Sequence, residues 1–141
     1  MARTKKGTPI RLLSVEEKAF RMDTQALTPD DNDALFGFNY SFSPDEEENT
    51  VAVFFEVLMY TNDMQELLLL DTVFNFKTDH LKKYLELDDT GQARLTGITK
   101  PLLEVAVATA RGLLIGKTAG TPLSRFVLPL IDVTRMTRAD I

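Results

Sequence analysis

The fold is decided by residues 35–76, LFGFNYSFSPDEEENTVAVFFEVLMYTNDMQELLLLDTVFNF. Aromatic rings recur at every second position in the first part of this stretch, at Phe36, Phe38, Tyr40 and Phe42. A period of two places all four rings on one face of a β-strand. Polar turns then separate this strand from two longer apolar segments.

The apolar segments and their turns predict an antiparallel sheet. We expect strands over 9–22, 34–43, 50–60 and 66–77. Short turns favour neighbouring strands, so we expect them to form a sequential antiparallel meander.

The second half of the chain changes to helical spacing. We expect a short helix over 79–87 and a long helix that Thr99 caps and that ends at Gly116 or Gly120. A Gly-Thr-Pro loop and an apolar C-terminal segment follow. The fold class is therefore α+β: a four-stranded antiparallel meander sheet, a long helix, a loop and a short C-terminal helix. We expect one domain over 9–135, a disordered basic N-terminus over 1–8 and a tail over 136–141.

The amino-acid composition argues against several classes of function. The chain has 141 residues, no Cys, one His (His80) and a formal net charge of −5. Without Cys or further His, we expect no metal site, no cofactor and no enzyme activity. The negative charge disfavours nucleic acid as a partner, and no apolar run is long enough to insert into a membrane. No secretory signal is visible, so we expect a cytoplasmic protein.

Two strands, 50–60 and 66–77, are apolar on both faces, and one helix covers only one face of a sheet. The second face is covered either by self-association or by residues 78–95 and the C-terminal segment folding back. For self-association, as a dimer or a dimer of dimers, we expect an interface formed by Leu67, Leu69, Ala106, Ala110 and Arg111.

Acidic residues are concentrated over 23–48, where Lys and Arg are absent. This stretch is either a solvated surface or a docking face for a basic partner.

A second set of residues, which are apolar, suggests a groove for extended hydrophobic polypeptide. We expect it to be lined by the four rings at 36–42, with Leu123 and Phe126 on a part-exposed loop that acts as a lid.

Four short matches resemble the SecB export chaperones and their SecB-like relatives. They are Val73-Phe74-Asn75-Phe76, Ala110-Arg111, Gly120-Thr121-Pro122-Leu123 and Leu128-Pro129-Leu130-Ile131-Asp132-Val133. The order of these matches along the chain follows that of the family. Leu67 stands where the family has the acidic residue that docks the secretion ATPase, and Asp71-Thr72 replaces its glycines.

The resemblance implies a holdase chaperone that needs no ATP and binds unfolded polypeptide clients. It implies a tetramer, and as further partner either the secretion ATPase or a toxin–antitoxin system. The alternative function is a non-catalytic structural or assembly protein whose apolar faces bind only other copies of the chain.

Overall fold

A computed structural model describes residues 10–138 of the chain. Its main sheet has four antiparallel strands: β1 (Ile10–Met22), β2 (Leu35–Asp45), β3 (Thr50–Tyr60) and β4 (Glu66–Thr78). A second, two-stranded sheet pairs β5 (Leu85–Leu87) with β6 (Ala93–Leu95). The helices are α1 (Thr99–Thr118) and the short α2 (Val133–Arg138), and two 3-10 turns are η2 (Leu81–Tyr84) and η3 (Pro122–Arg125). The α+β class expected from the sequence is confirmed.

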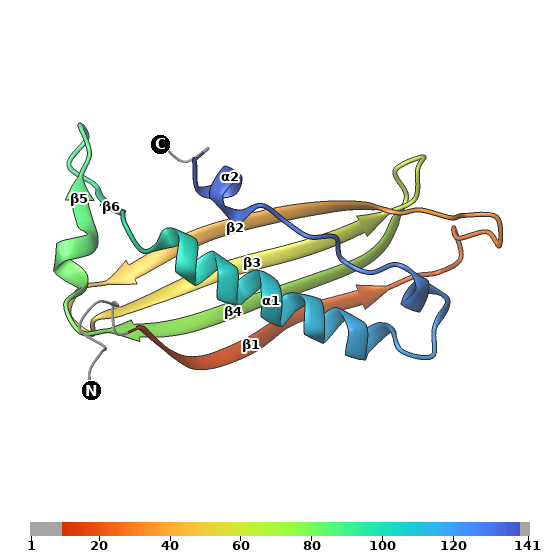
Figure 1. Cartoon of the computed structure of the whole chain (residues 1–141), viewed down its shortest axis with the longest axis horizontal. Coiled ribbons are helices and arrows are strands. Elements are labelled where there is room, and N and C mark those ends of the chain that lie inside the picture. Colours follow the sequence, from red (N-terminus) through yellow and green to blue (C-terminus); the bar gives the residue numbers. More distant parts are fainter. Residues whose placement is uncertain (1–9, 139–141) are drawn as a thin grey trace.

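The strand order corrects the expected meander. The order across the sheet is β1-β4-β3-β2, so β1 pairs with β4 rather than with β2. The turns between β2, β3 and β4 are short and hold these three strands as neighbours. The connection over residues 23–34 is longer, and it lets the chain pass from one edge of the sheet to the other (Figure 1).

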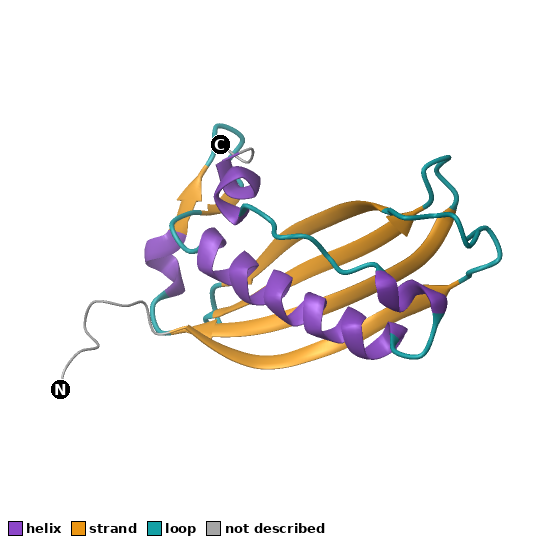
Figure 2. Cartoon of the chain, turned by 45° about the vertical axis from the view of Figure 1, so that its right-hand side comes forward, coloured by secondary structure: helices purple, strands orange, loops and turns teal. Residues whose placement is uncertain are grey.

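The molecule has two layers, because α1 and the segment after it cover one face of the sheet (Figures 1 and 2). Inward-facing residues of β3 and β4 pair across the ladder, as Val57 does with Leu70 and Val53 with Phe74. All four are buried in one cluster with the apolar side chains of α1. Burial of this shared surface is the main stabilising term of such a fold.

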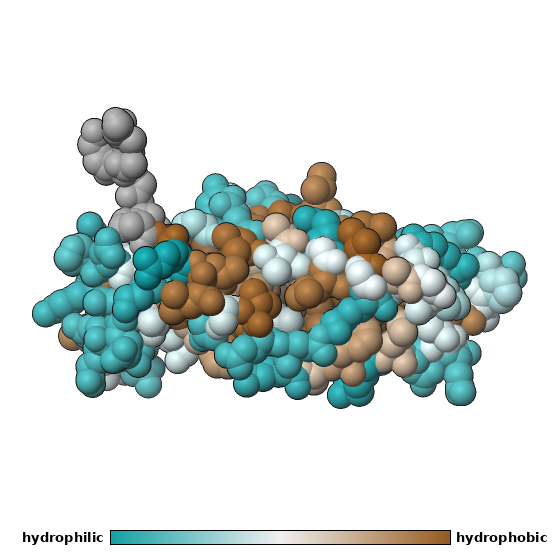
Figure 3. All heavy atoms as spheres, turned by 90° about the horizontal axis from the view of Figure 1, so that it is seen from below, coloured by the Kyte–Doolittle hydropathy of each residue, from teal (hydrophilic) through white to brown (hydrophobic). Residues whose placement is uncertain are grey.

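Polar contacts join α1 to the edge strand β1. Lys117 near the end of α1 forms an ion pair with Glu17, and its ammonium lies 4.5 Å from the ring centroid of Phe20. Two bulges interrupt the β1–β4 ladder, between Leu12 and Ser14 and between Glu17 and Ala19. The outer edge of β1 carries exposed apolar side chains, which are visible from below in Figure 3.

Several local expectations are wrong. Residues 79–87 form the turn η2 and the strand β5 instead of one helix, and β5 and β6 make a projecting hairpin around positive-φ Gly91 (Figure 1). Thr99 is the first residue of α1, while Ile98 occupies the capping position without a side-chain bond. α2 extends to Arg138, into the expected tail. The expected disorder over 1–8 lies outside the described residues.

Candidate functional site

The four rings of β2 lie on the sheet face that α1 covers. Their partners in the β2–β3 register are Met59, Val57, Phe55 and Val53, which are buried in the core. The rings themselves are only half-buried and pack against the core from the side. Phe38 stacks on Phe55 with ring centroids 6.1 Å apart, and Tyr40 meets Phe42 edge-on at the same distance. The expected single-faced stripe is therefore present, at the edge of the core.

Leu123 and Phe126 are not on a part-exposed loop, which corrects the expected lid. Leu123 is 0% exposed and Phe126 is 9% exposed, and both belong to the core cluster. Thr121 begins the turn η3 by accepting a hydrogen bond from the backbone N–H of Leu123 at 3.2 Å, and Pro122 follows in its first turn. This turn folds the loop back, so its two apolar side chains point into the molecule.

Arg111 binds backbone carbonyl groups within its own chain. Its Nε donates to the carbonyl oxygen of Leu128 at 3.3 Å, and its Nη2 donates to that of Pro129 at 2.9 Å. An Arg in an apolar helix suggested a contact with another subunit. Instead, its guanidinium carries several N–H donors and satisfies two carbonyls of an extended segment that lacks a partner strand.

Ala106 and Ala110 are fully buried against the chain's own sheet, so they cannot form the expected interface. The small side chains let α1 approach the sheet closely. The opposite side of α1 is exposed and mainly apolar from Val105 to Gly116, where Arg111 is the charged residue; its exposed members are Val105, Ala108, Gly112, Ile115 and Gly116. A Cβ atom added at Gly112 or Gly116 would meet nothing within 4 Å.

Leu67 and Leu69 do not share one surface. Leu67 falls at the irregularity of the β3–β4 ladder, where Tyr60 pairs with Glu66, and it joins the core at 1% exposure. It is therefore not available as an interface residue. Leu69 lies opposite Leu58 on the sheet face away from α1, where neighbouring side chains leave it 8% exposed.

The sheet face away from α1 has a shallow hollow that the sequence analysis missed. Its volume is about 350 Å³, and its lining includes Asn39, Phe54, Glu56 and Asp71. Glu56 pairs with Asp71 in the strand register, and Asn39 Nδ2 donates to Glu56 Oε1 at 2.7 Å. The period of two and the short β3–β4 turn were the signals that could have placed these carboxylates together. Neither belongs to the acidic stretch 23–48.

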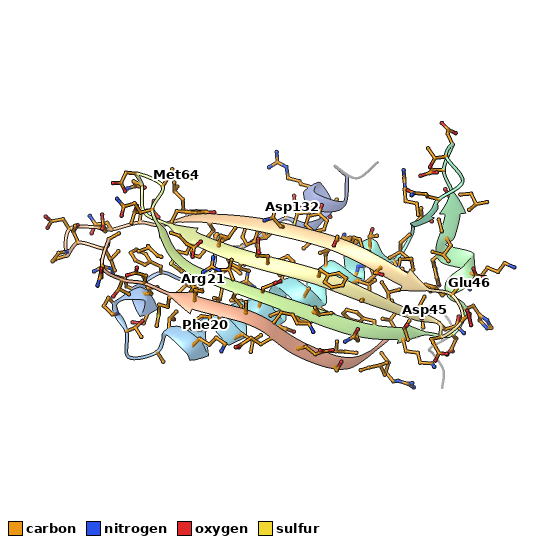
Figure 4. The ribbon with its side chains drawn as sticks, turned by 180° about the vertical axis from the view of Figure 1, so that it is seen from behind. Phe20, Arg21, Asp45, Glu46, Met64 and Asp132 are labelled. Atoms are coloured by element: carbon orange, nitrogen blue, oxygen red, sulfur yellow. The ribbon has the colours of Figure 1, made fainter. Side chains whose placement is uncertain are left out.

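The perturbed titratable groups lie outside the ring stripe. The pKa of Arg21 is raised because its guanidinium donates to Glu66 and is attracted by its charge; Figure 4 shows Arg21 on β1. Hydrogen bonds from Thr90 and Gln92 lower the pKa of Asp88 at the tip of the β5–β6 hairpin.

Within residues 10–138, no group of three His, Cys, Asp or Glu side chains is placed to hold a metal ion. In that same part of the chain, no helix is long and apolar enough to span a bilayer.

Comparison with known proteins gives a match in structure but not in sequence. No family model matches the chain, and no curated protein is significantly similar to it. A solved structure of the SecB-like chaperone Rv1957 of Mycobacterium tuberculosis, in complex with a ChAD peptide from the antitoxin HigA1, superposes with a TM-score of 0.62. The match covers 87% of this chain and 90% of that one at 10% identity. At this identity the likeness shows the fold, which is that of a SecB-like chaperone.

Proposed function

We propose that this protein is a holdase chaperone that binds extended segments of non-native polypeptide. The observation that carries the proposal is the stripe of Phe36, Phe38, Tyr40 and Phe42, half-buried at the edge of the core beside α1. We call the proposed client site between this stripe and α1 the groove. The SecB-like fold supports the proposal, since the matching chaperone was solved with a peptide.

Binding in this groove needs no ATP, cofactor or enzyme chemistry. Each square ångström of apolar surface removed from water contributes about 25 cal/mol, and rings supply much area for little conformational cost. Such contacts select apolar segments without reading an individual sequence. Release then follows from a partner or from dilution of the client.

The same comparison supports one class of partner. The matching chaperone binds a peptide of an antitoxin, so a toxin–antitoxin system is the favoured source of a dedicated client. The secretion ATPase is the other candidate. Leu67 is buried, and the carboxylates of the outer sheet face are Glu56 and Asp71. Docking of a basic partner would use that pair.

We also propose that the protein self-associates, as a dimer or a dimer of dimers, through the exposed side of α1. Val105 and Ile115 are exposed there beside Ala108, Gly112 and Gly116, which allow a second helix to approach closely. This interface replaces the one expected from Ala106, Ala110 and Leu67. Light scattering at micromolar concentration should give two or four times the chain mass of 15.8 kDa.

The same exposed side of α1 favours a second candidate, an assembly protein whose apolar surfaces bind only other copies of the chain. The two candidates differ in what remains accessible after assembly. A chaperone should bind a fluorescent apolar dye as an oligomer and slow the aggregation of an unfolded model protein without ATP. An assembly protein should do neither.

Two phenylalanines on opposite sheet faces make a matched test of the groove. Phe38 belongs to the stripe, while Phe54 is 42% exposed on the face away from α1. Phe38→Ala should weaken the suppression of aggregation several-fold, whereas Phe54→Ala should leave it unchanged. Circular dichroism must show that both variants stay folded. If Phe54→Ala alone abolishes suppression, the client lies on the other sheet face, and wild-type protein without any effect would refute the chaperone proposal.

A further inference from the structure

Residues 126–132, which we call the strap, lie over the sheet in extended form. The strap runs beside α1 from η3 to α2 without joining a helix or a strand (Figures 1 and 2). Its side chains begin in alternation: Phe126 and Leu128 are buried, while Val127 is 56% exposed between them. Further along, Leu130 is 94% exposed.

The strap is held as a bound peptide would be held. Among the residues described, the backbone N–H groups of residues 127–131 donate no backbone–backbone hydrogen bond. Pro129 has no N–H to donate. The polar contacts that fasten the middle of the strap are the two bonds from Arg111 to the carbonyls of Leu128 and Pro129. Lifting the strap therefore breaks side-chain contacts and leaves the sheet ladders intact.

The strap and α2 cover the same part of the core that the ring stripe borders. Ile131 and Met136 are partly buried against the cluster on which the four rings also pack. The hydroxyl of Tyr40 donates to the carbonyl oxygen of Met136 at 2.7 Å, which ties the end of this segment to the stripe. An extended client entering between α1 and β2 would meet the strap already in place.

We infer that the strap is an intramolecular competitor for the client, an inference that rests on the proposed function. In the free protein it fills the groove, and it yields to a client segment with apolar residues at alternate positions. The carbonyl groups of that client replace those of Leu128 and Pro129 on Arg111. Because only chains with a lifted strap bind, the apparent dissociation constant equals the intrinsic one divided by the lifted fraction. Weakening the strap must therefore tighten client binding.

Two leucines of the strap give a matched pair of variants. Leu128→Ala removes a buried anchor, while Leu130→Ala removes an exposed side chain of the same kind. The probe is reduced, carboxymethylated α-lactalbumin, a permanently unfolded chain, labelled for fluorescence anisotropy. We expect Leu128→Ala to lower its dissociation constant at least about three-fold and Leu130→Ala to change it by less than a factor of about two.

Methyl NMR on the wild-type protein measures displacement without any substitution. Client binding should remove the nuclear Overhauser effects between the Leu128 methyl groups and the core cluster, while those between the paired Val53 and Phe74 of the sheet stay. This measurement decides the question even where Leu128→Ala proves too unstable to purify.

The possible outcomes distinguish a failure of the strap inference from a failure of the chaperone proposal. If the wild type binds the client but the contacts of the Leu128 methyl groups with the core are unchanged, the strap is not displaced and the inference fails while the chaperone proposal stands. If the wild type binds the client and Leu128→Ala binds it more tightly while Leu130→Ala does not, both are supported. If neither protein binds the client, both the inference and the proposed function are refuted.

Discussion

Substitution of Leu123 tests whether the loop after α1 belongs to the core. The sequence alone placed Leu123 on a part-exposed lid, where a polar or small replacement costs within about 1 kcal/mol. In the structure it is fully buried at the centre of the turn η3. Replacing a buried Leu by Ala removes apolar contacts and leaves a cavity, which costs about 2.7–5 kcal/mol. Since a domain is stable by about 5–15 kcal/mol, Leu123→Ala should remove a large share of the stability.

The assay is urea unfolding followed by circular dichroism, at one protomer concentration because assembly adds to apparent stability. Leu130→Ala is the matched control, and its 94% exposure predicts a change within about 0.5 kcal/mol. The midpoint for Leu123→Ala should fall far below those of the wild type and the control. A loss under about 1 kcal/mol would mean that η3 is detached from the core in solution. That result would restore the lid expected from the sequence.

Three further predictions address the stripe, the helix face and the hairpin. Tyr40→Phe removes the bond to the Met136 carbonyl and should cost about 0.5–1.5 kcal/mol in urea unfolding; an unchanged midpoint would show that α2 is not tied to β2. Gly112→Glu places a charge on the exposed side of α1, so light scattering should show a smaller assembly, whereas Ser124→Glu on η3 should not change it. NMR titration should place the pKa of Asp88 below 3.8, because Thr90 and Gln92 donate to its carboxylate, and Thr90→Ala should raise it. Because the pKa of Asp88 is lower in the folded chain than in the unfolded chain, its charged carboxylate stabilises the hairpin at pH values above the unfolded-state pKa. This stabilisation is lost as the pH falls through the folded-state pKa, and an Asp88 pKa at or above 3.8 would contradict it.

The strands could be predicted from the sequence because each depends on local spacing. Alternation over Phe36–Phe42 and the polar turns at 44–49 and 61–63 fixed β2, β3 and β4 and their order. The place of β1 could not be read this way. A connection as long as residues 23–34 allows pairing with either edge of the sheet, and only packing chooses β4.

The site was harder to predict because its residues act through tertiary contacts. The ring stripe is visible as a period of two, but the burial of Leu123 depends on a turn that Thr121 and Pro122 start. The N–H groups of Arg111 donate to backbone carbonyls, and no pattern of residues in the sequence predicts such a contact. Ala106 and Ala110 were expected at an interface between copies of the chain, yet their side of α1 faces the chain's own sheet.

The hydrogen bonds around the strap determine how it can open. Before it, the turn η3 is closed by bonds from Ser124 to Thr121 and from Phe126 to Leu123. After it, the N–H groups of Arg135 and Met136 bond to Asp132. These bonds keep η3 and α2 folded, while buried Leu123 and the bond from Tyr40 to the Met136 carbonyl tie the two ends to the core. Opening therefore requires the middle of the strap to bow outward rather than the whole C-terminal segment to leave. The groove can then admit an extended segment while Leu123 stays in the core, and client binding need not cost the stability that Leu123 supplies.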